Sequence, residues 1–175
     1  HIHADHISAL NELNKRTNCI RVMGEKSKSE VIDLRIKDGE KINVEEVELQ
    51  AIYTPGHTDC SYSFLMNDRV FTGDTLLING SGRTDFQNGN AYDAYDSIFN
   101  KLLKLPEKTF VFPAHDYNGK KFSTIENEKN NNPRLQVSSK EEYADIMNNL
   151  NLANPKMMDV AVPANVKGLT LDNIN

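Results

Sequence analysis

The sequence has no excess of positive charge, few cysteines and no long apolar run, and each absence excludes a class of protein. It has 20 lysines and arginines and 25 aspartates and glutamates, which gives a net charge of −5. A nucleic-acid-binding surface is therefore not indicated. No stretch approaches the roughly 18 consecutive apolar residues of a membrane span. Two cysteines, Cys19 and Cys60, form neither a disulfide framework nor a Cys-x-x-Cys site. We therefore expect a reducing compartment, the cytoplasm or, in a eukaryote, the mitochondrial matrix.

The overall composition is that of an ordinary globular domain. A length of 175 residues, 38% of them hydrophobic and 26% charged, suits one domain with a sizeable core. The first residue, His1, already belongs to a cluster of metal-ligand side chains, and such a cluster needs rigid support on both sides. We therefore expect residues 1–175 to be the C-terminal portion of a longer domain.

Metal-ligand side chains are concentrated at the start of the chain, in the HIHADH segment of residues 1–6. Three histidines and one aspartate in six positions is a density that core packing does not produce. Imidazole suits Zn, Fe, Cu and Ni, and carboxylate oxygen widens the choice. The other two histidines are His57 in a PGHT sequence and His115 in a PAHD sequence, and Asp74 directly follows an apolar run. All five histidines can thus be placed in one metal site.

Hydrophobic periodicity predicts a mixture of strands and helices in which the candidate ligands follow strand ends. Strands expected at 47–53, 69–72 and 109–112 precede His57, Asp74 and His115 respectively. This order favours α/β layers, with ligands on loops that a sheet holds rigidly. The other expected elements are strands at 19–23, 32–37, 42–44 and 61–66 and helices at 7–16, 91–105 and 140–150. The remaining tail is expected to be irregular, and Asn130–Asn132 a solvated helix end.

The order of these motifs resembles the signature of the metallo-β-lactamase superfamily. The motifs are HxHxDH, PGHT, Gly-Asp after an apolar hairpin, and a late PAHD. The resemblance implies an αββα sandwich with a metal site at one edge, in which half of the sandwich precedes HxHxDH. Because this sequence starts at that motif, we expect its N-terminal half to be missing.

Longer stretches are similar to one branch of this superfamily, the persulfide dioxygenases, or sulfur dioxygenases. These stretches are GDTLLINGSGRTDFQ at 73–87, HDY at 115–117, NPRL at 132–135 and VPAN at 162–165. The resemblance implies one Fe(II) per chain, held by the catalytic residues His1, His57 and Asp74. Two histidines and one carboxylate leave coordination positions open. The implied reaction converts glutathione persulfide, O2 and water to sulfite and glutathione. Most of its rate acceleration is expected to come from holding the persulfide and O2 close together.

The remaining metal-ligand residues leave a second interpretation open. His3, Asp5, His6 and His115 would orient the iron ligands by hydrogen bonds, but together with Asp74 they could also build a second metal site. The alternative is therefore a glyoxalase II-like thioesterase in which two Zn ions activate a hydroxide against glutathione thioesters. The family-specific stretches favour iron. A non-catalytic metal-binding fragment is a third interpretation, which the intact ligand set argues against.

Three residues are candidates for binding the substrate. Arg134 offers a planar fork for a carboxylate of glutathione, and Tyr117, two residues beyond His115, should lie near the metal. Arg83 is a weaker candidate, because bracing of the glycine-rich loop at 80–89 is its favoured role. Cys60 is expected to be a buried free thiol rather than a ligand or nucleophile. The sequence leaves a homodimer open.

Overall fold

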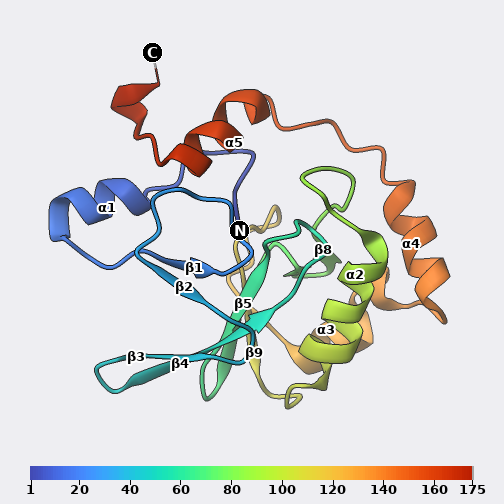
Figure 1. The fold of residues 1–175 in the computed structure, drawn as a ribbon. Helices are drawn as coiled ribbons and strands as arrows, with labels where there is room; N and C mark the ends of the chain where they lie inside the picture. The colour runs from blue at the N-terminus through green and yellow to red at the C-terminus, as the bar shows by residue number, and fades with distance from the viewer. Residues whose placement is uncertain (175) are drawn as a thin grey trace.

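A mixed six-stranded β-sheet forms the centre of the structure (Figure 1), a computed structural model that describes residues 1–174. The strand order is β10-β9-β6-β5-β4-β3, and only β6 and β9 are parallel neighbours. Because β4 and β6 both run antiparallel to β5, the strands β4, β6 and β9 end at the same edge. The strands are β3 (Lys41–Val44), β4 (Val47–Tyr53), β5 (Tyr62–Leu65), β6 (Arg69–Gly73), β9 (Phe110–Pro113) and β10 (Ser123–Thr124).

Helices cover one face of this sheet and form the main core with it (Figure 1). Leu65, Val70 and Val111 stand in register across β5, β6 and β9 and point into this layer. Ile98 and Leu102, both fully buried, pack against them. The covering elements are α2 (Ala91–Tyr95), η1 (Asp96–Lys101), η2 (Leu102–Lys104), α3 (Ile125–Asn131), η3 (Pro133–Leu135) and α4 (Lys140–Asn148). The helix expected at 91–105 is thus one helical segment with a π turn in its middle.

The opposite face of the sheet carries an apolar row without a helical cover among the described residues. Ala51, Phe64, Phe71 and Phe112 stand in register across β4, β5, β6 and β9. Ile36 of the small parallel pair β1 (Val22–Gly24) and β2 (Leu34–Ile36) covers one end of the row, whereas Phe71 is 39% exposed. One sheet with helices on one side is the half of an αββα sandwich that we expected.

Several local signals are confirmed by the structure. The break expected at Glu45 is a tight turn in which that residue has a positive φ of 54°, and β5 and β6 form the expected hairpin. Side-chain caps begin the helices as local chemistry favours: Asn90 caps α2, Thr124 caps α3 and Ser139 caps α4. No helix among the described residues is both long and apolar enough to span a bilayer.

Other expectations were wrong at the ends of the chain. The helix expected at 7–16 begins later, as α1 (Leu10–Thr17). The tail expected to be irregular contains α5 (Met158–Lys167) and η4 (Leu171–Asn173). Pro163 lies inside α5 and obscured its helical pattern. Asn132, expected to be solvated, is fully buried and donates to Gly80 O and Glu128 Oε2.

Candidate metal centre

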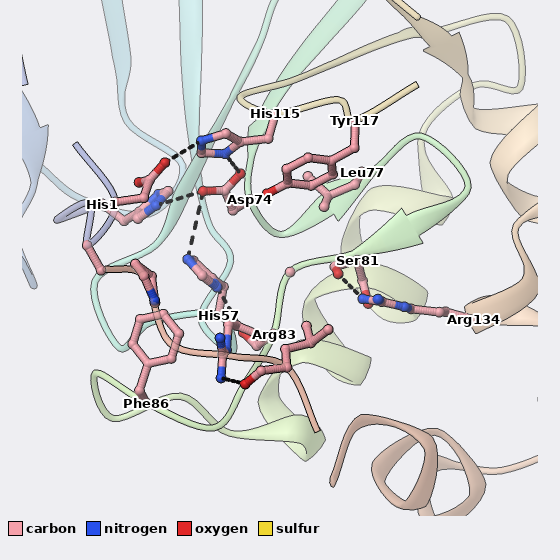
Figure 2. A pocket seen from close by; sticks show the side chains of 15 residues that line it. His1, His57, Asp74, Leu77, Ser81, Arg83, Phe86, His115, Tyr117 and Arg134 are labelled. Atoms are coloured by element: carbon pink, nitrogen blue, oxygen red, sulfur yellow. Dashed lines mark hydrogen bonds and ion pairs between the residues drawn. The ribbon is translucent and has the colours of Figure 1, made fainter. Parts of the chain in front are cut away.

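The candidate ligands converge at the edge of the sheet where β4, β6 and β9 end. His57 follows β4, Asp74 follows β6 and His115 follows β9. The loop of residues 1–6 adds its own histidines and aspartate to these side chains, and Figure 2 shows His1 of this loop beside Asp74. The seven side chains that the sequence singled out therefore meet in one place, although they are far apart in the chain.

His1, His57 and Asp74 form one group of potential ligands. Each offers one atom, and these atoms all lie within 4.8 Å of one another. Asp74 Oδ2 is 3.1 Å from His1 Nε2 and 3.8 Å from His57 Nε2. His1 Nε2 is buried and has no hydrogen-bond partner among the described residues. A buried nitrogen without a partner is costly, and a metal ion accepting its lone pair would remove that cost.

His3, Asp5, His6 and His115 form a second group, whose atoms also lie within 4.8 Å of one another. This group is more open to solvent, since Asp5 and His6 are exposed. Asp5 joins two of its members by hydrogen bonds, with His6 Nδ1 3.0 Å from Asp5 Oδ1 and His115 Nε2 2.9 Å from Asp5 Oδ2. The two groups meet where His115 Nδ1 donates to Asp74 Oδ1 at 2.6 Å.

The charges of these groups suit a cation. Burial acts to raise the pKa of Asp74, but the His115 hydrogen bond and the nearby imidazoles outweigh it and hold the pKa below its ordinary value. Burial lowers the pKa of His57 and, with neighbouring charges, that of His3 to about 4. The hydrogen bond to Asp74 raises the pKa of His115 to about 9. An ionised Asp74 beside a neutral His57 is the protonation state in which the first group binds metal, whereas the raised pKa keeps His115 protonated at neutral pH.

The loop of residues 80–89 orients His57. Its ring Nδ1 donates to the carbonyl oxygen of Arg83 at 2.8 Å, which leaves Nε2 facing Asp74. The same loop approaches Asp74 so closely that a Cβ at Gly82 would lie 1.9 Å from the Asp74 carbonyl oxygen. Only glycine fits there, because any side chain would displace the backbone of a ligand.

A pocket of about 150 Å³ opens onto the first group (Figure 2). It is lined by His1, His57, Asp74 and His115, and also by apolar side chains to which no sequence motif assigned a role. These are Leu77, Phe86, Leu152 and Pro155. Leu152 and Pro155 lie beyond α4 and carry no local signal of a binding role, so periodicity could not have found them.

Tyr117 and Arg134 both line this pocket, as expected. The Tyr117 ring stacks on His115 with 6.2 Å between ring centroids and is 83% exposed. Arg134 donates to Ser81 O, and burial lowers the pKa of its guanidinium. No carboxylate pairs with Arg134 among the described residues. A half-buried cation without an anionic partner beside a pocket can accept an anionic group.

Arg83 is engaged within the protein. Its guanidinium donates twice to Asp85 at 2.6 Å, to Ala153 O at 2.7 Å and to Leu152 O at 3.1 Å. It also lies over the Phe86 ring at 4.7 Å. These contacts favour the bracing role over substrate contact, and the brace extends to residues 152–154. Cys60 is buried, contacts Thr58 Oγ1 at 3.4 Å and lies outside both ligand groups.

Comparisons with known proteins agree with this geometry. The model of the metallo-beta-lactamase superfamily matches residues 1–115. The human mitochondrial persulfide dioxygenase ETHE1 is 44% identical over 170 residues, which cover 95% of this chain and 66% of the human protein. The chain thus spans just under two thirds of that relative.

Two further relatives correspond to the two chemical interpretations. The crystal structure of ETHE1 from Myxococcus xanthus matches with a TM-score of 0.92 at 48% identity, over 95% of this chain and 73% of that one. A hydroxyacylglutathione hydrolase of Buchnera aphidicola is 35% identical over 118 residues, which cover 67% of this chain and 46% of the hydrolase. Similarity to the ETHE1 proteins is higher and extends further.

Proposed function

The chain belongs to the metallo-β-lactamase superfamily and within it to the ETHE1-like family, and from this premise we propose that it acts as an iron-dependent persulfide dioxygenase. Glutathione persulfide, O2 and water would give glutathione and sulfite, with two protons released. The sulfane sulfur is oxidised, and O2 is reduced. The observation that carries the proposal is the group of His1, His57 and Asp74 at the wall of a pocket that Tyr117 and Arg134 also line.

His1, His57 and Asp74 would hold a single Fe(II). Two imidazoles and one carboxylate on one side of an ion suit this metal and leave its other positions open. When bound, Fe(II) supplies a redox-active centre that can bind both O2 and the soft sulfur donor of a persulfide. The protein's own contribution is orientation, since the Arg83 carbonyl fixes the His57 ring and His115 fixes the Asp74 carboxylate.

One contact argues for a single metal rather than two. His115 is hydrogen-bonded through both ring nitrogens, to Asp74 and to Asp5. A histidine bonded to two carboxylates in this way orients them, which is the role expected of it beside a single metal. The binuclear zinc thioesterase remains the alternative, because His3, Asp5, His6 and His115 still lie within ligand distance of one another.

Arg134 and Tyr117 are proposed to hold the glutathione part of the substrate. Arg134 presents a guanidinium that no carboxylate neutralises, and glutathione carries two carboxylates. The apolar side of the pocket, with Leu77, Leu152 and Pro155, would keep water from the reacting sulfur. We further propose a reducing compartment, the cytoplasm or the mitochondrial matrix, and a homodimer remains a prediction.

Metal content and substrate choice test the proposal together. After anaerobic purification, we expect about one iron per chain and O2 uptake that depends on glutathione persulfide. Hydrolysis of S-lactoylglutathione by the same sample should be negligible. Two zinc ions per chain with efficient thioester hydrolysis and no persulfide-dependent O2 uptake would replace the proposal by its alternative.

A further inference from the structure

The loop of residues 1–6 carries four of the seven potential metal ligands but contains no helix or strand. Its backbone groups therefore lack the partners that secondary structure would supply. Side chains on a loop are held in place only as firmly as the loop itself. The residues that bind its carbonyl groups consequently determine how well its ligands are aligned.

Asn165 of α5 binds this loop at three points. Its Nδ2 donates to His3 O and to His6 O, each at 2.9 Å. Its Oδ1 accepts from the backbone N–H of Ser8 at 2.8 Å. The side chain is only 8% exposed, and Figure 1 places α5 beside the dark-blue start of the chain. Both hydrogens and the oxygen of the Asn165 carboxamide thus form hydrogen bonds to a segment more than 150 residues away in the sequence.

We propose that Asn165 is a positioning residue of the metal centre. Because one carboxamide binds the carbonyl groups of both His3 and His6, it holds these two backbone positions close together. The backbone between them is thereby fixed, and with it the directions in which the side chains of His3, Asp5 and His6 point. This inference rests on the proposed metal site. It adds α5 to the elements that support that site. No ligand motif in the sequence indicates this role for α5.

The chemistry of the contact requires a carboxamide. Two carbonyl oxygens need two N–H donors, while the Ser8 N–H needs an acceptor on the same side chain. An ionised aspartate has the same shape but no donor, so it would face both carbonyl oxygens with a negative charge. Gln87 supports the loop from its other side, with Nε2 donating to Ile2 O at 2.9 Å.

Asn11 provides a matched control. It is also a buried asparagine, 7% exposed, and its Nδ2 donates to Gly168 O at the end of α5. Arg21 donates to its Oδ1 at 2.8 Å. Asn11 therefore ties α5 to α1 without touching residues 1–6. The change Asn11→Asp also removes a carboxamide donor from a contact that holds α5 in place. It leaves the hydrogen bonds to residues 1–6 unchanged.

Loading the full chain with Co(II) gives a readout that does not depend on catalysis. The visible absorption of bound Co(II) reports its ligand geometry, and its decay in excess EDTA reports release. In Asn165→Asp we expect an altered spectrum and release on the order of 10- to 100-fold faster than wild type, the usual cost of losing an orienting contact around a metal. Asn11→Asp should match the wild-type spectrum and release rate even where it lowers the melting temperature.

The outcomes separate the inference from the proposed function. Equal release rates in wild type, Asn165→Asp and Asn11→Asp would overturn the role of Asn165 while leaving the metal site in place. Failure of the wild type to bind Co(II) at all would overturn the proposed function itself. Should Asn165→Asp not fold, Asn165→Ser, which keeps one donor, should release Co(II) faster than wild type by a smaller factor, and an unchanged rate there would also overturn the inference.

Discussion

At the scale of single residues, Asp74 connects the two ligand groups. Its Oδ2 faces His1 and His57, while its Oδ1 accepts from His115. One oxygen is thus available to an ion and the other fixes the orientation of the carboxylate. A residue with both tasks has no substitute nearby, whereas the more exposed members of the second group have neighbours that can replace them.

Substitution of the ligands should separate these tasks. Asp74→Ala and His57→Ala should each abolish iron retention and O2 uptake, because a three-ligand site has no spare donor. His6→Ala, whose side chain is 48% exposed, should keep iron and turn over more slowly. Iron content and O2 uptake on the same samples check this. If His6→Ala instead loses one of two bound metals, the site is binuclear.

Arg134 should act on substrate affinity. A bidentate pair between a guanidinium and a carboxylate contributes about 1.5–3 kcal/mol, so Arg134→Ala should raise KM for glutathione persulfide by about ten- to a hundred-fold. If binding of the remote carboxylate also orients the sulfur, kcat should fall as well. Rates of O2 uptake as a function of substrate concentration give both constants.

A small persulfide without carboxylates is the control for Arg134. It should react poorly with the native protein and be nearly indifferent to the substitution. An equal loss with both substrates would mean that Arg134 supports the β7–β8 hairpin (Leu76–Leu77 and Gly80–Ser81), since the guanidinium donates to Ser81 O. The assignment of glutathione would then depend on family membership alone.

At the scale of elements, the loop of residues 80–89 contains its own control for close packing. A Cβ at Gly82 would meet the backbone of Asp74 at 1.9 Å, whereas at Gly80 the nearest atom is Leu77 Cβ at 3.9 Å. Gly82→Ala should therefore cost about 1–3 kcal/mol of unfolding free energy, as overpacking does, and weaken metal binding. Gly80→Ala should change both little. Denaturant melts and metal titrations of the pair would contradict this if the two variants behaved alike.

The pair β1–β2 should show a pH-dependent contribution to stability. Hydrogen bonds from Arg21 lower the pKa of Asp33 from 3.8 to about 2. A carboxyl with a lowered pKa in the folded state stabilises that state above its unfolded pKa, and the effect disappears as the pH falls through the folded value. Asp33→Asn should therefore lower the melting temperature at neutral pH. The difference from wild type should shrink as the pH falls from about 4 to about 2; a constant difference would exclude the charge as its cause.

Sequence and structure agree where the signal is local. The strand before His57 alternates apolar and polar residues, those before Asp74 and His115 are short and mostly apolar, and Gly or Pro follows or ends each one. Such patterns are read directly from the chain. The half-sandwich was expected because the motif order resembles a known family rather than because of periodicity. The fold and the grouping of the candidate ligands therefore had sufficient signals in the sequence, whereas the role of each ligand stays a prediction.

The features that the sequence patterns did not predict depend on contacts between residues far apart in the chain. Asn132 and Glu128 look like polar surface residues, yet both are fully buried because Glu128 accepts from Asn79 N, Asn132 and Ser123. Leu152 faces the pocket because Arg83 holds its carbonyl group. Pairings of this kind arise only when the chain is folded.

At the scale of the whole molecule, a bound metal would join parts of the chain that are far apart in sequence. His1 belongs to the first loop, while His57 and Asp74 belong to the sheet. An ion that binds only the folded state stabilises it by about 2.7 kcal/mol at a free concentration of 100 times Kd. Chelation should therefore lower the melting temperature, and Fe(II) or Co(II) should restore it. Equal melting temperatures with and without metal would show that the ligands do not form one site in solution.

The common direction of β4, β6 and β9 has a practical consequence for protein engineering. The loops that carry His57, Asp74 and His115 leave one edge of the sheet, so the turns at Glu45-Glu46 and Asn67-Asp68 lie at the other edge. A strand advances about 3.3 Å per residue, which puts a full strand length between these turns and the ligands. A short peptide tag or a fluorescent reporter inserted between Asn67 and Asp68 would enter an exposed turn, next to the hydrogen bond that Phe110 N of β9 donates to Asp68 O. That position is where the protein can be labelled or attached to a surface while its ligand geometry stays as it is.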